Sequence, residues 1–541
     1  MRNSLFSATI LAAAALAVVQ PAYAATPADT LVIVREISSI ADWDPAVSQI
    51  LDVNEINNDV YERLVGFDPR NPKELIGTLA ESWTVAEDGS SITFKIRPDV
   101  KFHSGNPVTA QDVLFSFRRL MLLGREPSAS MRAMGFTADN LDAGLQAPDD
   151  LTFVLKPPLK LAPSFVINLV SSSPFAIVDS ELVKSHEKDG DFGSAWLSSR
   201  SSAADSAGSG PFKISTYRAG DLLILDRNDE YWQFTPSMRR VMFRHVPEAG
   251  TQRLLLENGD ADVAFNITAS DAEAMANSKD VRVDFHPSRR LLYFGFNTAK
   301  EPFDDPRVTK AMKYLIDYEG LEKTIMKNLG TIQQGFIAQP FLGATDERPF
   351  KLDVEKAKAL LAEAGLSDGF SFTFTAYNRK PEMDLATSFQ ATAAQAGVKV
   401  NIVNMPVSQT IPLYRDRKLE ALQLSYSGGY GDPHATASKF AFNPGALPGA
   451  DPAAQWPSEL SWRLGWAPKE LSELTVQASQ ELDEAKRAEL YAEMQKKAWE
   501  ISPFAILFQA TQALGMRADV QGYSYGARGA DISFAAVTKN R

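Results

Sequence analysis

The chain has no cysteine in its 541 residues. This absence excludes disulfide bonds, thiolate nucleophiles, cysteine-bound metal centres and a lipid anchor on a cysteine. Histidine is scarce as well, and its five residues lie far apart with no metal-binding spacing: His103, His186, His245, His286 and His434. The sequence also lacks a nucleophile elbow, a phosphate-binding loop and a dinucleotide-binding glycine motif. These absences argue against an enzyme, and we expect no catalytic residues, no metal and no cofactor.

Positive charge is in deficit, with 55 Lys and Arg against 67 Asp and Glu, for a net charge of −12. An acidic chain is a poor partner for nucleic acid or for an anionic membrane surface, and we expect neither. The composition, 45% hydrophobic and 23% charged, is that of an ordinary globular protein. The length allows two or three domains with ample cores.

Long apolar runs are missing except at the N-terminus. Arg2 provides a positive start, Leu5–Val19 is uncharged and apolar, and Ala22-Tyr23-Ala24 is a small-x-small cleavage site. This pattern predicts a secretory signal peptide, residues 1–24, cleaved after Ala24. A membrane anchor is the alternative, but its apolar run is short for a span. We therefore expect a soluble protein in the periplasm of a Gram-negative cell.

Local patterns along the chain predict an α/β fold. Apolar and polar residues alternate from 92 to 96, as in a strand with one buried face. Ser-Gly-Asn-Pro at 104–107 predicts a turn, and Thr109 with Asp112 predicts a capping-box helix start whose apolar face extends to Met121. Two further helices are predicted over Asp353–Ala364 and Glu481–Trp499, the second with Leu482, Leu490, Tyr491 and Met494 on its inner face. The predicted strands are Leu222–Leu225, Val281–Phe285, Leu291–Phe296, Ser371–Ala376, Val398–Val403 and Phe504–Phe508.

Residues 94–120, FKIRPDVKFHSGNPVTAQDVLFSFRRL, resemble the signature segment of a known family. The family is the bacterial extracellular solute-binding proteins, family 5, the peptide- and nickel-binding receptors of ABC importers. The resemblance continues along most of the mature chain, in the segments Gly208–Phe212, Asn228–Trp232, Thr251–Val263, Phe296–Asp317, Asp353–Gly365 and Tyr426–Pro433.

The resemblance implies a two-lobed periplasmic binding protein of cluster C type, with mixed sheets, a central cleft and an extra subdomain inserted in lobe I. Two chain crossings, near Arg290–Asn297 and Ser502–Thr511, would form the hinge. The implied parts are lobe I at 25–68, 203–290 and 501–541, the inserted subdomain at 69–202, and lobe II at 291–500.

The resemblance also implies where the ligand binds. In peptide-binding members, the Asp of an aromatic-x-Gly-Asp turn pairs with the free amine of the ligand. Aligning Tyr426 with that aromatic residue places Gly429 at the position of this Asp, while Asp432 matches an Asp-Pro that follows. Either Asp432 substitutes as the amine partner, or the ligand has no amine there.

Further candidates are cations and aromatic residues. Arg379 and Arg290, or its neighbour Arg289, could bind a ligand carboxylate through a guanidinium. Tyr426, Tyr430 and Trp43 could form apolar walls of the cleft. The alternatives are exposed surface positions for the arginines and core packing for the aromatic residues. The string Gly431–His434 is similar to nickel-chelate binders of the family, but one histidine in a loop does not make a metal site.

The leading hypothesis is a periplasmic receptor that captures a small polar solute, with a di- or oligopeptide as first choice. It would deliver the solute to ABC permease subunits, and through them to the ATPase subunits, as a monomer that binds no nucleic acid. An opine, a glycoside or a nickel chelate is the alternative ligand. The hypotheses of another class are a periplasmic chaperone or sensor partner and a secreted hydrolase.

Overall fold

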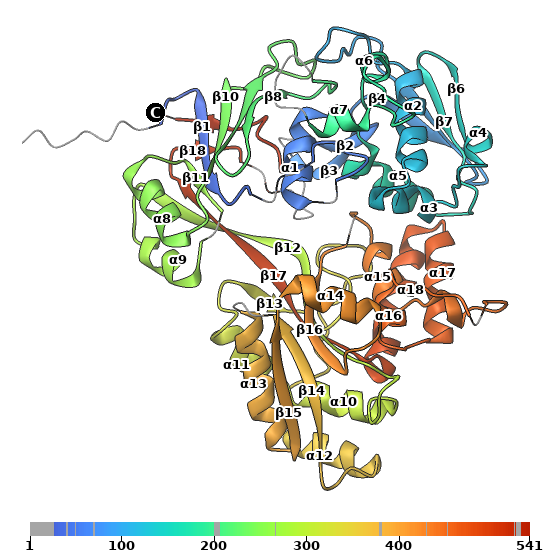
Figure 1. The fold of residues 1–541 in the computed structure, drawn as a ribbon, viewed down its shortest axis with the longest axis vertical. Helices are drawn as coiled ribbons and strands as arrows, with labels where there is room; N and C mark the ends of the chain where they lie inside the picture. Colours follow the sequence, from blue (N-terminus) through green and yellow to red (C-terminus); the bar gives the residue numbers. More distant parts are fainter. Residues whose placement is uncertain are drawn as a thin grey trace, which may run out of the picture.

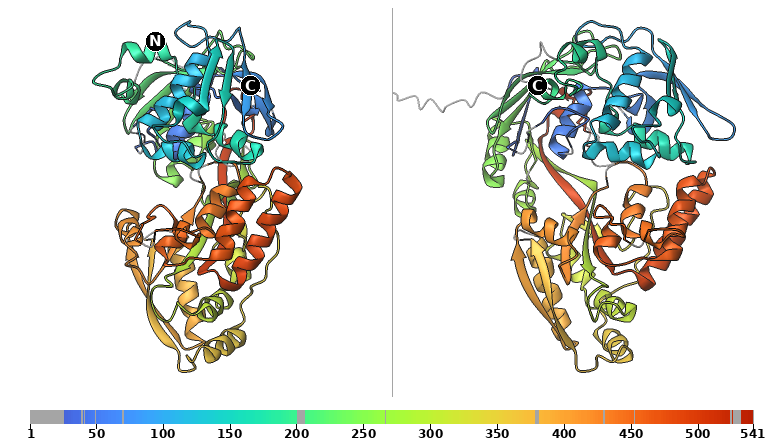
Figure 2. Two further views of the ribbon diagram at one scale, coloured as in Figure 1. Left: turned by 90° about the vertical axis from the view of Figure 1, so that its right-hand side faces the viewer. Right: turned by 45° about the vertical axis from the view of Figure 1, so that its right-hand side comes forward.

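The computed structural model describes residues 26–38, 40, 42–48, 50–68, 71–199, 206–265, 267–377, 381–428, 430–451, 453–523, 525 and 532–540. These residues form two bodies, one above the other in Figure 1 and in both views of Figure 2. We call the upper body lobe I and the lower body lobe II. Two long strands, β12 (Val281–Phe296) and β17 (Phe504–Arg517), run from one lobe into the other. The prediction of an α/β fold with two lobes is confirmed.

Lobe I is built on one half of a large mixed sheet. Its strand β1 (Thr30–Arg35) is parallel to β10 (Arg240–His245) and to β11 (Val263–Ala264), and its alternate residues Leu31 and Ile33 are fully buried. The sheet continues antiparallel through β9 (Leu222–Arg227) and β8 (Phe212–Arg218). The remaining elements of this part are α1 (Leu51–Val60), α7 (Ser194–Ser198), α8 (Ala249–Asn258), α9 (Ala269–Met275), β18 (Val520–Gln521) and β19 (Thr538–Lys539).

A second layer of lobe I is an antiparallel sheet in the order β4-β5-β7-β6, packed against α2 (Ala110–Leu122). The predicted strand is β5 (Ile92–Ile96), with Ile92, Phe94 and Ile96 buried. Thr109 and Asp112 form the predicted capping box of α2. The other elements here are β2 (Val65–Asp68), β3 (Asn71–Gly77), β4 (Ala80–Val85), β6 (Leu145–Asp149), β7 (Thr152–Leu155), α3 (Ala129–Ala133), α4 (Leu141–Gly144), α5 (Pro163–Val170), α6 (Ser180–Ser185) and the short 3-10 helices η1 (Glu126–Ser128) and η2 (Ser173–Phe175).

Lobe II carries the other half of the large sheet, β15-β14-β16, covered by helices. Its strands are β13 (Gly330–Ile332), β14 (Phe370–Tyr377), β15 (Val398–Met405) and β16 (Ala421–Tyr426). Its helices are α10 (Pro306–Tyr314), α11 (Tyr318–Lys323), α12 (Val354–Glu363), α13 (Glu382–Ala394), α14 (Val407–Arg415), α15 (His434–Phe440), η4 (Pro444–Ala446), α16 (Leu460–Arg463), α17 (Lys469–Gln480) and α18 (Glu484–Ile501). Asp353 caps α12, as the sequence predicts.

The crossing strands make one sheet continuous through both lobes. β12 and β17 pair antiparallel along their length, and β17 also pairs with β11 in lobe I while β12 pairs with β16 in lobe II. The register of the pair shifts between Pro287 and Leu291. Two separate strands were predicted here, Val281–Phe285 and Leu291–Phe296. The chain forms one strand instead, because both parts pair with the same strand β17, on either side of the register shift.

The predicted helix over Glu481–Trp499 begins three residues later than expected. Asp483 accepts hydrogen bonds from the amides of Ala485 and Lys486 and so caps α18. Leu482 therefore lies in the link between α17 and α18 and is 48% exposed, contrary to its predicted inner position. Tyr491 and Met494 are fully buried, as predicted.

Candidate functional site

A cleft of about 900 Å³ opens between the two lobes, and we call it the interlobe cleft. Lobe I contributes side chains of α1, η1, α3 and the segment 171–174, and lobe II contributes β12, α14, β16, α15 and α16. The volume lies at the upper end of the roughly 300–1,000 Å³ typical of small-ligand sites. Because both lobes line it, a solute bound there would contact both at once. Such contacts are what shifts an opening and closing equilibrium.

Aromatic side chains of lobe II form one wall of the cleft. Tyr426 ends β16, Tyr430 lies in the loop that follows, and Tyr293 projects from β12. Burial raises the pKa of Tyr426, and the charges that act on it include Glu459 and Arg463 of lobe II, Arg289 of the crossing strand β12 and Glu126 of lobe I. The phenol of Tyr426 therefore lies where the two lobes face each other.

The charged lining of the cleft is mostly cationic. The five cations are Arg132, Arg289, Arg415, Lys439 and Arg463, and the two carboxylates are Glu126 and Glu459. Glu459 is already engaged, since its carboxylate lies 2.9 Å from the Lys439 ammonium. Arg132 donates to the hydroxyl of Ser128 at 2.6 Å. The cleft is thus positive in a chain whose net charge is −12.

The sequence-predicted ligand residues fall into three groups. Tyr426 and Tyr430 line the interlobe cleft. Trp43, Asp432 and Arg290 do not; Arg290 is half-buried on β12, and its neighbour Arg289 lines the cleft instead. Gly429 and Arg379 lie outside the described residues.

Asp432 is occupied by an internal partner. Its two carboxylate oxygens accept hydrogen bonds from the guanidinium of Arg487, at 2.7 and 2.9 Å, and both residues are 1% exposed. The Asp432 carboxylate also caps the start of α15 through the amide of His434. The pair thereby ties the loop after β16 to α18, and the structure uses Asp432 as a support for the Tyr430 loop.

The same loop touches lobe I on the side of the cleft away from β12 and β17. The ring of Phe165, from α5, lies 5.8 Å from Tyr430 and 5.0 Å from His434 between ring centroids. The backbone adds a hydrogen bond of 2.8 Å from Ala162 to Ser479. Burial lowers the pKa of His434 to about 4, so its ring is neutral at pH 7. We call this set of residues the interlobe contact.

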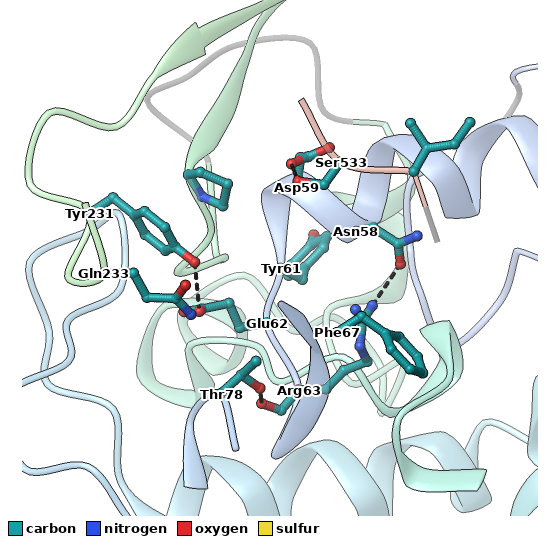
Figure 3. Close-up of a pocket in the computed structure, with 12 residues that line it drawn as sticks. Asn58, Asp59, Tyr61, Glu62, Arg63, Phe67, Thr78, Tyr231, Gln233 and Ser533 are labelled. Atoms are coloured by element: carbon teal, nitrogen blue, oxygen red, sulfur yellow. Dashed lines mark hydrogen bonds between the residues drawn. The ribbon is translucent and has the colours of Figure 1, made fainter. Parts of the chain in front are cut away.

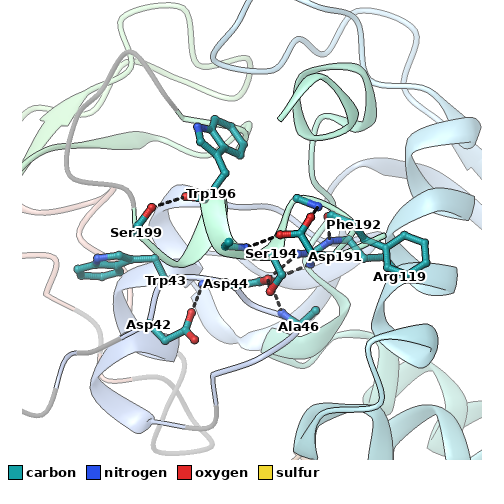
Figure 4. A network of polar contacts seen from close by, with 12 residues as sticks. Asp42, Trp43, Asp44, Ala46, Arg119, Asp191, Phe192, Ser194, Trp196 and Ser199 are labelled. Carbon is teal, nitrogen blue, oxygen red and sulfur yellow. Dashed lines mark hydrogen bonds and ion pairs between the residues drawn. The ribbon is translucent and has the colours of Figure 1, made fainter. Parts of the chain in front are cut away.

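Trp43 lies in the core of lobe I. It is 1% exposed and packs edge-on against Tyr217, with ring centroids 5.1 Å apart. The next acidic residue, Asp44, pairs with Arg119 of α2, and Ser194 donates to the same carboxylate at 2.8 Å (Figure 4). The Asp-Trp-Asp-Pro loop is therefore a structural junction between β1, α2 and α7, which explains why its tryptophan packs inward.

A second, much smaller cavity of about 50 Å³ lies inside lobe I, lined by Glu62, Asp59, Tyr231 and Arg63 among others (Figure 3). Glu62 accepts hydrogen bonds from Trp232 at 2.9 Å, Ser209 at 2.9 Å and Tyr231 at 3.2 Å. Burial raises the pKa of Glu62 to about 7 despite these donors. The volume is too small for a solute, and the polar groups serve the lobe's interior.

Besides Arg132 and Lys439, sequence reasoning missed two cations of lobe II that line the cleft, Arg415 and Arg463. They lie at the ends of two short helices, α14 and α16, and no motif marks either helix.

Within the residues that the structure describes, no group of three or more His, Asp or Glu side chains could hold a metal ion. The described helices are all too short or too polar to span a membrane.

Comparisons with known proteins agree with this architecture. The model of the family described as bacterial extracellular solute-binding proteins, family 5, middle, matches residues 74–447. The probable D,D-dipeptide-binding periplasmic protein DdpA of Escherichia coli is 27% identical over 534 residues, which cover 97% of each sequence. The glutathione-binding protein GsiB of Escherichia coli is 24% identical over 477 residues, 87% of this chain and 88% of that protein.

Solved structures share the fold. The periplasmic binding protein DppA from Helicobacter pylori, in complex with the peptide STSA, matches with a TM-score of 0.78 at 22% identity, covering 95% of this chain and 98% of that one. AgaA from A. tumefaciens, in complex with agropinic acid, matches with a TM-score of 0.73 at 21% identity, covering 95% and 99%. With two lobes, a cleft lined by both and a family match that extends from β3 into the segment after α15, the chain belongs to the bacterial extracellular solute-binding proteins of family 5.

Proposed function

We propose that this protein is the periplasmic substrate-binding component of an ABC importer. It captures a small polar solute in the interlobe cleft, closes around it and delivers it to membrane permease subunits, which are driven by their ATPase subunits. The observation that carries the proposal is the cleft itself, which is lined by side chains of both lobes and has a volume of about 900 Å³. The names of the relatives, a D,D-dipeptide-binding and a glutathione-binding protein, support a di- or oligopeptide-like ligand.

The hinge in this proposal is the register shift in the β12–β17 pair. At Pro287–Leu291 the two strands pass from the lobe I part of the sheet to the lobe II part. Strands that lose regular pairing over a few residues can absorb the backbone rotation that closure requires. The bounds that we propose are 25–68, 203–290 and 501–541 for lobe I, 69–202 for its inserted subdomain and 291–500 for lobe II.

The proposal includes export and the absence of catalysis. Residues 1–24 act as a signal peptide that is cleaved after Ala24, and the mature protein is a monomer without a cofactor. Native mass spectrometry of the protein purified from periplasm would give the mature mass, the oligomeric state and the mass of any retained solute.

Solution scattering tests the receptor mechanism directly. We expect the radius of gyration of the protein to fall when a solute that binds is added, because closure brings the lobes together. The control is the protein after denaturation and refolding, which removes retained solute. The proposal would be contradicted if the protein retains no solute and if no member of a broad library of peptides, opines, glycosides and metal chelates causes compaction.

A further inference from the structure

The inference concerns the charge of the solute, and it rests on the function proposed above. Arg463 is only 8% exposed, yet it lines the interlobe cleft. Its Nε donates to the carbonyl of Pro457 at 2.7 Å, and its guanidinium lies 5.1 Å from the ring centroid of Tyr414. Among the described residues, no carboxylate lies within 4.0 Å of it. A buried cation is ordinarily paired, because taking an unpaired charge out of water is costly.

Arg463 also faces phenols rather than carboxylates. Burial raises the pKa of Tyr293, Tyr414 and Tyr426, and the charge of Arg463 opposes that rise at each of them. Its guanidinium therefore lies beside the Tyr414 ring, and its charge acts on the phenols of Tyr293 and Tyr426, which line the cleft. A site with a cation, phenol groups and apolar ring faces suits an anionic group on an otherwise weakly polar solute.

Two more arginines, one on α14 of lobe II and one on the crossing strand β12, face the same space. Arg415 is exposed in the last turn of α14, and no side chain of the described chain pairs with it. Arg289 lines the cleft from β12, and its charge acts on the same Tyr426 phenol as Arg463. Among the described residues that line the cleft, the only carboxylate of lobe II is that of Glu459, and Lys439 pairs with it.

An ammonium group would find no equivalent partner in lobe II. Asp432 is buried against Arg487 and does not line the cleft. Position 429 is a glycine and has no side chain to offer. His434 is neutral at pH 7, since burial lowers its pKa to about 4. In the part of the cleft that the structure describes, Glu126, on the opposite lobe, is the one carboxylate without a paired cation.

We propose that the cleft selects a solute by an anionic group, which Arg463 binds with help from Arg289 and Arg415, and that a free ammonium group is not required. N-acylated amino acids and peptides, and sugar acids condensed with amino acids, are the solutes that fit this chemistry. A positively charged peptide does not fit, because it would place a cation among three arginines, and an amidated peptide does not fit, because it lacks the C-terminal carboxylate.

The test uses one peptide hydrolysate in three forms: untreated, N-acetylated and C-terminally amidated. The full-length mature protein is incubated with each, separated by gel filtration, and the retained molecules are identified by mass spectrometry. We expect the acetylated form to be retained at least as well as the untreated one. We expect the amidated form to be retained about tenfold less or worse, because losing a charged partner costs at least 1.4 kcal/mol, which is about tenfold.

Two variants and a control separate charge recognition from folding. Arg463→Gln and Arg415→Gln should each lower the ratio of acetylated to amidated peptide that the protein retains. Each should also make the affinity for acetylated peptide less dependent on the NaCl concentration. Arg415 is exposed, so its variant is not expected to disturb folding. Arg239→Gln, an exposed arginine paired with Asp29 in lobe I, is the matched control and should change neither quantity. A purely structural defect would lower retention of both forms equally.

The outcomes distinguish this inference from the function on which it rests. If amidated peptides are retained as well as acetylated ones, or if acetylation abolishes retention of a peptide that otherwise binds, the inference is overturned and the receptor function stands. If no form is retained and no solute copurifies with the protein, the receptor function fails and the inference fails with it. A copurified solute with a net negative charge would support both.

Discussion

Asp432 and Arg487 form a two-bond ion pair that is buried where lobe II meets helix α5 of lobe I, with 1% of each residue exposed. The pair joins the loop after β16, which carries Tyr430, to helix α18. In the sequence, Asp432 is the best candidate for an amine-binding carboxylate. In the structure it supports the loop, and this difference gives a direct experiment.

We expect Asp432→Ala to destabilise the protein by about 3–5 kcal/mol, because it leaves the buried Arg487 without its partner. Urea unfolding followed by tryptophan fluorescence measures the change. The double variant Asp432→Leu with Arg487→Met should recover most of the loss, since it removes both charges. If Asp432→Ala keeps its stability and loses only its affinity for free-amine peptides, Asp432 binds the ligand after all.

The Asp44–Arg119 pair should behave in the same way in lobe I. Both residues are at most 2% exposed, so Asp44→Asn is expected to cost about 3–5 kcal/mol. The exposed pair Arg239–Asp29 is the comparison, and Arg239→Gln should cost less than about 1 kcal/mol. Equal effects of the two substitutions on urea unfolding would mean that burial does not set the strength of these pairs.

The interlobe contact should hold the lobes together. Phe165→Leu removes the ring that packs on Tyr430 and His434, so we expect a larger radius of gyration by solution scattering in the absence of solute. Phe175→Leu is the matched control, because Phe175 is an equally buried ring that packs on Phe117 within lobe I. An identical radius of gyration for the two variants would rule out a closing role for Phe165.

Protonation of His434 should lower the free energy of unfolding at acidic pH. Burial lowers the pKa of this histidine to about 4, below its usual 6.5, so the unfolded chain binds more protons than the native one between these values. The stability that His434 contributes is present above pH 6.5 and is lost as the pH falls toward 4. We expect a loss of about 2 kcal/mol between pH 7 and pH 5. In His434→Asn this loss should disappear, as measured by urea unfolding at both pH values.

Glu62 should change the stability in the opposite direction, lowering the free energy of unfolding as the pH rises. Burial raises the pKa of Glu62 to about 7, so the native state holds a proton that the unfolded chain releases near pH 4.5. Its contribution to stability is present below pH 4.5 and is lost as the pH rises through 7. Relative to the wild type, Glu62→Gln should therefore gain about 2 kcal/mol between pH 5 and pH 7.5. A difference independent of pH would show that Glu62 is ionised in the native state.

Periodicity and capping chemistry sufficed to predict many of the elements. The strand at 92–96, the capping box of Thr109 and Asp112, and the cap at Asp353 depend on residues a few positions apart. Interactions over such short spacings are already present in the local chain, so the sequence alone predicts them. The prediction that Leu482 lies on the inner face of a helix was wrong, because its apolar side chain fits the helical pattern but the helix begins only after the Asp483 cap.

The binding site could be predicted only in part. Tyr426, the last residue of β16, and Tyr430, in the loop after it, both line the cleft. Trp43 instead points into the core, and Asp432 is paired with a residue 55 positions away. The cationic lining joins Arg289 of β12 with Arg415 and Arg463 of two separate helices. No periodicity links these residues, because their proximity arises from the packing of elements that are distant in the chain.

The amino-acid sequence was therefore enough for the export signal hypothesis and the α/β class, since composition and short-range spacing carry both of these, and the family resemblance of its motifs implied the two lobes. The partner of each buried charge, and the side chains that face the solute, depended on how the lobes fold and meet. A charge pairs with whatever the tertiary packing brings within a few ångströms of it. That packing gave Asp432 an arginine as its partner and left Arg463 facing the cleft.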